Sequence, residues 1–426
     1  MTSAAPATIG QTSSARQAIV AVFMQVVAVV VYSWTVFREP LAQLHGWSKA
    51  QTIMPYRYSL IAVAIGTVVG GLWHDRRGAR VVASTGGILV GIGFLVSAIY
   101  GNTVGGLVIG WGIMGGVGSG FAYVTPIANL VRWFPDKRGT MVGLAVMGAG
   151  LSPLFWGPLI EKLVGRDAAR FATTIPNTFE IMAVIFVVAV VGAAQFYRVP
   201  PPGWTPPGFV FGTHRRQGME VSPRQMFATW QFYALWLIFL LGSAVGLTAI
   251  GQVAPLFQEF AKASAPISAG VAVGIMGVCN GSGRLGWGAI SDHIGRKPTL
   301  VAMNIVSIVV CVGFLHSVQG VWHLIFGLCL AAFAYGGFLS LMPSFSADYF
   351  GEGNVGGNYG FLFSAWGLSG FLLPGYFEGL LDHAREAGNL VAGYQDVYAK
   401  LAIFAAAAAL FAAFLRKPRT KPLRPG

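Results

Sequence analysis

The chain has 426 residues, of which 55% are hydrophobic and only 10% are Asp, Glu, Lys or Arg. Its mean hydropathy is +0.64. Soluble domains carry roughly a quarter charged residues, so this composition excludes an ordinary soluble protein. The net charge of +13 comes from Lys and Arg that gather in loops on one side of the chain, so we do not expect nucleic-acid binding.

Apolar segments long enough to cross a bilayer, about 20 residues each, recur along the whole chain. Residues 1–15, which precede the first segment, are rich in Ser, Thr and Ala and are expected to form a disordered cytoplasmic tail. Only helices satisfy every backbone group of a lipid-exposed segment. The pattern predicts an all-α integral membrane protein with twelve transmembrane helices, centred near residues 27, 62, 91, 115, 150, 188, 241, 278, 307, 333, 368 and 405.

The orientation follows from the distribution of Lys and Arg. With an even number of helices both termini share one side, and most of the cationic residues lie in the loops of that side, including Arg76, Arg77, Arg132 and Arg138. Cationic loops remain in the cytoplasm. We therefore expect a multi-pass protein of the cell membrane with both termini cytoplasmic and a basic tail at 417–426.

Two stretches of the chain echo each other. "GLWHDRRGAR" begins at Gly71 and "GAISDHIGRK" begins at Gly288, 217 positions later, and "GFAYVTP" matches "GFLSLMP" at the same offset. Between the repeats lies a proline-rich polar stretch that cannot continue a helix. The sequence predicts two pseudo-symmetric six-helix bundles, 16–198 and 227–416, joined by a cytoplasmic linker at 199–226.

The repeated loop, G-x-x-x-D-x-x-G-x-R in its first copy, resembles the signature loop of the major facilitator superfamily. Three further motifs resemble its oxalate/formate antiporter branch, which sits beside the monocarboxylate transporters: "YSWTVF", "RWFPDKRG" and "PPPGWTPPG". The resemblance implies the major facilitator fold, transport by alternating access, and loops that help to hold the outward-facing state.

Each repeated loop places a carboxylate, Asp75 or Asp292, at a helix end beside arginines. A carboxylate there suits a neighbouring helix N-terminus and ion pairing. We interpret Asp75, Arg80, Asp292 and Arg296 as gating residues that clamp helices in one conformation. The alternative is a turn that only fixes the topology.

Arg284 is the one charged residue between Ile267 and Ser291. It lies eight residues before Asp292, or about 12 Å into the hydrocarbon, where an arginine costs at least ~2.5–3.5 kcal/mol. The equivalent position in the first half is Thr67, so the repeated fold does not require this cation. Asn280 shares its helix face. We interpret Arg284 and Asn280 as an anion-binding site; the alternative is an arginine satisfied by carbonyls or by a buried acid.

Aromatic residues are expected at a similar depth. The resemblance implies that Tyr32, Tyr123, Tyr335 and Phe363 line the substrate cage, although each one could instead serve packing. Where the oxalate/formate antiporter has a second cation, this chain has Trp366. One cation balances a monocarboxylate better than a dicarboxylate.

Arg57 lies near the outer rim. It either extends its charge to the membrane surface or attracts anions toward the site.

The predicted function is proton-coupled transport of small monocarboxylates such as lactate or pyruvate. An oxalate/formate-type exchanger and a non-transporting membrane sensor remain alternatives. The acid and lysine that couple protons in animal monocarboxylate transporters are replaced here, by Asn280 and by Val31 or Tyr32, so coupling would need another route. No catalytic motif suggests an enzyme. We expect no cofactor or metal, and a monomer whose partners are the anion, a proton and the bilayer.

Overall fold

The computed structural model describes residues 5–165, 167–201, 204, 220–261, 269–316 and 321–418, and these residues form helices and connecting turns without strands. The first half contains α1 (Ala5–Ala28), α2 (Thr35–His45), α3 (Lys49–Arg77), α4 (Ala79–Tyr100), α5 (Val104–Leu107), α6 (Gly116–Trp133), α7 (Arg138–Val164), α8 (Phe171–Phe186) and α9 (Gly192–Ala194). The second half contains α10 (Pro223–Met226), α11 (Trp230–Ala261), α12 (Ala269–Ile294), α13 (Arg296–Val309), α14 (Val321–Phe350), α15 (Val355–Glu386) and α16 (Leu390–Phe414).

Within the described ranges the helices form twelve columns, six in each half. π-helical turns join α5 to α6 and α8 to α9 and extend α13, at Val108–Gly115, Val187–Val191 and Val310–Leu315. Ten of the columns are long and apolar enough to cross a membrane by length and composition. The other two are α12 and α15, which carry polar side chains toward the centre of the molecule. The predicted fold class is confirmed: an all-α membrane protein of two six-helix bundles.

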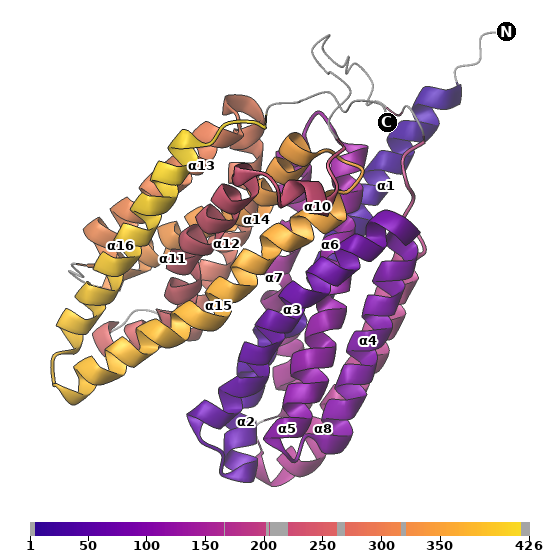
Figure 1. The fold of residues 1–426 in the computed structure, drawn as a ribbon. Helices are drawn as coiled ribbons and strands as arrows, with labels where there is room; N and C mark the ends of the chain where they lie inside the picture. Colours follow the sequence, from indigo (N-terminus) through magenta and orange to yellow (C-terminus); the bar gives the residue numbers. More distant parts are fainter. Residues whose placement is uncertain are drawn as a thin grey trace.

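The two bundles converge at one end and splay apart at the other (Figure 1). Helix α1 begins and α16 ends at the converging end, which we call the termini end. Helices α3 and α15 pack along each other, as do α7 and α12, and these two pairs form most of the contact between the halves.

The ends of the chain differ in part from the expected boundaries. Helix α1 begins at Ala5, so most of the tail expected at 1–15 is helical. Pro6 lies in its first turn, where a missing N–H costs little, and Ala favours the helix. Most of the expected linker, 202–203 and 205–219, and the tail from 419 onward lie outside the described residues.

The first column is interrupted at mid-depth. Helix α1 ends at Ala28, a 3₁₀ turn spans Val30–Trp34, and α2 starts at Thr35. Two residues of α7 satisfy the carbonyls freed at this break: the Ser152 hydroxyl donates to the Val29 carbonyl at 3.0 Å, and Trp156 Nε1 donates to the Val27 carbonyl at 3.2 Å. The break therefore replaces helix bonds by bonds to a neighbouring helix and turns Tyr32 toward the interior.

The repeated loops end their helices in the same way. Gly78 follows α3 with φ +81°, and Gly295 follows α12 with φ +94°. Residues with a side chain rarely adopt this conformation, which explains why glycine closes both copies of the loop.

Candidate functional site

The halves approach so closely at the termini end that backbones touch. A Cβ added to Gly71 would lie 2.0 Å from the Gly356 carbonyl oxygen, and one added to Gly288 would lie 2.2 Å from the Gly139 oxygen. The offset of 217 relates both glycines of the first contact to those of the second. The sequence repeat thus corresponds to two equivalent contacts between halves, α3 with α15 and α12 with α7.

A second layer of contacts lies deeper in the molecule. A Cβ on Gly360 would lie 2.7 Å from the Thr67 carbonyl oxygen, and a Cβ on Gly143 would lie 2.4 Å from the Arg284 carbonyl oxygen. The same offset relates Thr67 to Arg284. The close backbone contact is therefore present in both copies of the repeat, whereas the charged side chain is present only in the copy that contains Arg284.

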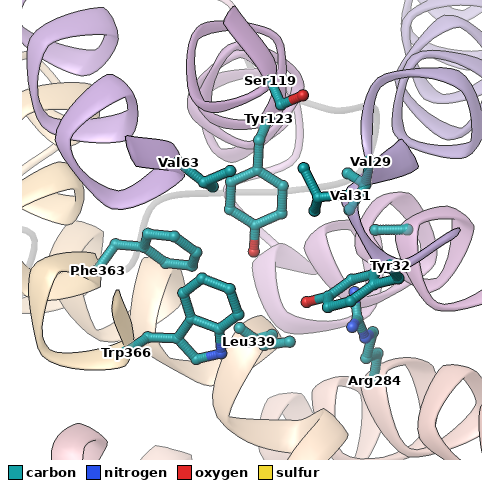
Figure 2. Close-up of a pocket in the computed structure, with 11 residues that line it drawn as sticks. Val29, Val31, Tyr32, Val63, Ser119, Tyr123, Arg284, Leu339, Phe363 and Trp366 are labelled. Atoms are coloured by element: carbon teal, nitrogen blue, oxygen red, sulfur yellow. The ribbon is translucent and has the colours of Figure 1, made fainter. Parts of the chain in front are cut away.

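A small cavity lies between the halves at this second layer (Figure 2). The space open to the centre of a water-sized sphere is about 10 Å³, which is room for about one water molecule. The Tyr32 and Tyr123 hydroxyls point toward the space between Trp366 and Arg284. The lining consists of one cation, aromatic rings, a serine and aliphatic side chains: Val29, Val31, Tyr32, Val63, Ser119, Tyr123, Ala149, Arg284, Leu339, Phe363 and Trp366.

Arg284 is 2% exposed and carries the charge of this lining. Its Nε donates to Asn280 Oδ1 at 2.9 Å, and its Nη1 donates to the Val146 carbonyl at 2.7 Å. Asn280 in turn donates Nδ2 to the Ala332 carbonyl at 3.3 Å. Among the described residues no carboxylate pairs with Arg284, so its charge is held by neutral acceptors. A guanidinium has five N–H donors, so donors are left for an anion in the cavity.

Aromatic rings form the wall opposite Arg284. Phe363 stacks on Trp366 with centroids 4.7 Å apart and contacts Tyr123 at 5.0 Å. Trp366 Nε1 donates to the Tyr335 hydroxyl at 2.6 Å, and the hydroxyls of Tyr123 and Tyr359 lie 3.3 Å apart. These contacts hold the rings against one another in this conformation.

Ser119 is a lining residue that the sequence interpretation missed. It is 1% exposed, and its hydroxyl has no hydrogen-bond partner among the residues that the structure describes. It lies on α6, directly after the π-helical turn Val108–Gly115, and such turns are frequent at functional sites. A buried hydroxyl without a partner is unfavourable, so this group is available to a ligand.

The predicted binding residues fall into two groups. Tyr32, Tyr123, Arg284, Phe363 and Trp366 line the cavity. Tyr335 and Asn280 stand behind it, each bonded to a lining residue. The aliphatic lining residues were not predicted, because a valine or leucine in an apolar helix carries no distinguishing signal.

At the termini end, Asp75 joins α3 to the first turn of α15. Its Oδ1 accepts from the Gly356 N–H at 3.2 Å, and its Oδ2 accepts from the Gly357 N–H at 2.7 Å. Arg132 Nη2 also donates to Oδ1, at 3.0 Å.

Asp292 makes the equivalent contact between α12 and the first turn of α7. It accepts from the Gly139 N–H at 3.0 Å, and from the Thr140 N–H at 2.7 Å and hydroxyl at 2.6 Å. Arg296 Nη1 donates to Asp292 at 2.6 Å, and its Nε donates to Asp348 at 3.1 Å. Each aspartate thus binds the second and third residues of a helix in the other half, where the helix dipole favours an anion.

The arginines around these clamps differ from the expected set. Arg80 does not contact Asp75; its Nε donates to the Tyr197 carbonyl within the same half at 2.9 Å. Two other arginines bridge the halves. Arg132 donates to the carbonyls of residues 352 and 353, and Arg138 pairs with Asp348 and with the Glu352 carboxylate. Sequence spacing relates Asp75 to Arg80 but gives no information on arginines of other helices.

Arg57 lies on the opposite side of the cavity from the clamps. Its guanidinium sits 5.3 Å from the centroid of the Phe371 ring of α15, so it also spans the two halves. Phe371 is five residues beyond Trp366, about 7.5 Å along the helix. Arg57 is exposed and is not part of the cavity lining.

The sequence profile of the major facilitator superfamily matches residues 18–374 and 266–426. The chain belongs to the major facilitator superfamily. The resemblance inferred from the repeated loop is thereby confirmed, and the protein is a multi-pass secondary transporter of a family and fold that are not those of enzymes.

Similar proteins include carriers of small carboxylates. The chain is 28% identical over 353 residues to the oxalate:formate antiporter of Oxalobacter formigenes, covering 80% of this chain and 78% of that protein. It is 25% identical over 356 residues to the apicoplast pyruvate carrier 1 of Toxoplasma gondii, covering 71% and 64%. It is 27% identical over 346 residues to the uncharacterized MFS-type transporter YhjX of Escherichia coli, covering 79% and 81%.

Solved structures share the fold at low identity. The proton:xylose symporter XylE superposes with a TM-score of 0.71 at 17% identity, covering 96% of this chain and 97% of that chain. The fucose:proton symporter FucP of E. coli gives 0.68 at 14%, covering 94% and 98%. These likenesses extend over whole chains and establish the fold alone.

Proposed function

We propose that this transporter moves small monocarboxylate anions, of the size of lactate or pyruvate, across the cell membrane. The observation that carries the proposal is Arg284, a buried cation that lines the cavity between the halves and has no carboxylate partner in the described chain. A single carboxylate balances one guanidinium, and the apolar and aromatic remainder of the lining suits a short carbon chain. The names of the relatives, an oxalate:formate antiporter and a pyruvate carrier, support the same chemical class.

Alternating access follows from the arrangement of the contacts. The clamps made by Asp75 and Asp292 hold the termini end closed, and the bundles splay toward the other end (Figure 1). The substrate would approach Arg284 from the splayed end, and the cavity, which has room for about one water molecule, must widen to admit it. Transport then requires the clamps to open and the splayed ends to close around the cavity, with Asp75, Asp292 and Arg296 as gating residues.

Orientation, oligomeric state and coupling complete the proposal. The cationic loops favour a cytoplasmic termini end. Each chain encloses its own cavity between its two halves, so a monomer suffices for transport. The described lining contains no carboxylate or histidine, so a proton that is coupled to transport of the anion would use a group outside this lining.

Uptake of labelled lactate and labelled oxalate into proteoliposomes, with and without an inward proton gradient, tests the proposal. Removing one partner of a buried charged pair costs about 2–5 kcal/mol, so Arg284→Gln should reduce lactate uptake by at least ~30-fold. Arg57→Gln is the matched control, because it removes a cation that lies between the halves but outside the cavity lining, and it should retain uptake within a few-fold. Equal uptake by wild type and Arg284→Gln would refute the assignment of the site.

Oxalate:formate exchange is the second candidate, favoured by the relative that carries this name. It would appear as oxalate uptake driven by internal formate and insensitive to the proton gradient. Because the described lining holds one cation, the second charge of oxalate would require Arg57 to enter the cavity, and Arg57→Gln would then abolish exchange.

A further inference from the structure

A second concave site lies at the termini end, away from the cavity and the clamps. It is a groove of about 470 Å³ between the start of α11 and the residues that follow α16. We call it the α11–α16 groove, and it is lined by Trp230, Gln231, Phe414, Arg416 and Lys417. The transport mechanism uses none of these residues.

Two cations line the groove. Arg416 and Lys417 are exposed, and the described part of the lining includes no acidic residue. Their position is fixed by Leu415, which is buried and whose N–H donates to the Ala412 carbonyl at 3.2 Å. The start of α11, a helix of 32 residues, adds the partial positive charge of a helix N-terminus.

Gln231 adds a neutral polar group to the groove. The residue is 7% exposed and lines the groove. A glutamine amide has two N–H donors and one acceptor oxygen, so it can complement the two cations in binding a polar ligand.

The rim of the groove is apolar and faces outward. Trp230 is 51% exposed and Phe414 is 67% exposed, and Tyr233, one turn after Trp230, is 53% exposed. Trp and Tyr gather at the level of the lipid headgroups, where one end of the ring is in hydrocarbon and the other is hydrated. The groove thus combines a cationic interior with an apolar edge at the end of two membrane-spanning helices.

We propose that the α11–α16 groove binds the headgroup of an anionic phospholipid. The phosphodiester contacts Arg416, Lys417 and the Gln231 amide, and the acyl chains run along Trp230 and Phe414. A free phosphate ion would pair with the same cations, but it has no acyl chains that could contact the apolar rim. Basic pockets between transmembrane helices are suited to such headgroups, and each cation near the membrane surface contributes to the affinity.

The test uses the purified full-length transporter, freed of lipid, and titrates it with a short-chain phosphatidylglycerol, the matching phosphatidylcholine, or inorganic phosphate. Thermal unfolding and native mass spectrometry report binding. The variant is Arg416→Gln with Lys417→Gln. The matched control is Arg76→Gln with Arg77→Gln, which removes two exposed cations from the same end of the molecule but outside the groove.

We expect phosphatidylglycerol to bind tightly and to raise the unfolding temperature, with phosphatidylcholine and inorganic phosphate much weaker. The groove variant should bind phosphatidylglycerol about 10- to 30-fold more weakly, and the control variant should bind it like wild type. Equal loss in both variants would mean unspecific charge attraction and would overturn the proposal. Inorganic phosphate binding as tightly as phosphatidylglycerol would also overturn it, in favour of a soluble anion.

Discussion

Asp75→Asn removes the charge from a carboxylate that joins the two halves at the termini end. Asp75 accepts three hydrogen bonds, from the Gly356 and Gly357 N–H groups and from Arg132, at 3.2, 2.7 and 3.0 Å. An asparagine keeps one acceptor oxygen, and its NH₂ group faces a donor. At least one bond is lost and the others lose their charge.

The number and strength of these hydrogen bonds set the size of the expected shift between the closed and open conformations. Hydrogen bonds to charged groups contribute about 1.5–3 kcal/mol each, so the conformation closed at the termini end should lose about 2–3 kcal/mol relative to the open one. The equilibrium between the two conformations then shifts about 30- to 150-fold toward the open state. Asp292→Asn should act in the same direction, because Asp292 makes the equivalent contact with the Gly139 and Thr140 N–H groups.

Pulsed electron paramagnetic resonance on spin labels at positions 77 and 293 would measure this shift, in a background without the three native cysteines. Both positions are exposed near the clamps, one in each half. Either substitution should add a longer distance to the distribution. Asp382→Asn is the control, since Asp382 is 59% exposed and pairs with Arg385, three residues further along the same helix. If Asp75→Asn leaves the distances unchanged in a folded protein, Asp75 is not a gating residue.

Three further substitutions test the cavity and the contact between the halves. Trp366→Lys should increase oxalate uptake relative to lactate uptake at least ~10-fold, because it adds a second cation to the cavity lining. Trp366→Phe adds no charge and should leave this ratio unchanged. The same ratio in both variants would contradict the claim that the number of cations selects between mono- and dicarboxylates. Gly288→Ala should separate α12 from α7, because its Cβ would lie 2.2 Å from the Gly139 carbonyl oxygen. It should destabilise the conformation closed at the termini end by about 1–3 kcal/mol, measured as faster protease cleavage at that end. The control is Gly157→Ala, whose Cβ would meet nothing within 4 Å and which should leave cleavage unchanged. Ser119→Ala should raise the unfolding temperature, because it removes a buried hydroxyl that has no partner among the described residues. It should also lower the preference for lactate over propionate in competition assays, and an unchanged preference would exclude contact between Ser119 and the 2-hydroxyl of lactate.

Much of the architecture was predictable because it rests on local signals. The length and apolar character of each segment predicted where the helices lie in the chain, and the 217-residue offset predicted that the two halves have equivalent folds. The burial of Arg284 was also predictable, because helix rise alone gives its depth relative to Asp292. The same offset relates Gly139 to Gly356, whose helices α7 and α15 are the ones that Asp292 and Asp75 bind.

Contacts between helices that are distant in sequence were not predictable. The partner of Arg284 on α7 is a backbone carbonyl, at Val146, and every residue has one, so no side-chain pattern marks it. Arg132 rather than Arg80 approaches Asp75 because the rotation of α6 places it there. Rotation about a helix axis depends on packing against all neighbours, and this information is spread along the chain.

The bond between Arg284 and the Val146 carbonyl explains how one cation could couple binding to movement. It joins α12 to α7, and thus one half to the other, at the layer where Gly143 rests on the Arg284 backbone. A carboxylate that binds the remaining N–H donors attracts the guanidinium more strongly than the neutral carbonyl does. Substrate binding then weakens a contact between the halves in favour of a contact with the substrate. Among the described residues the equivalent layer at Thr67 has no such bond between the halves, because the Thr67 hydroxyl donates to the Val63 carbonyl of its own helix. A single site therefore suffices to loosen the interface, and the contact between α3 and α15 can remain a passive frame.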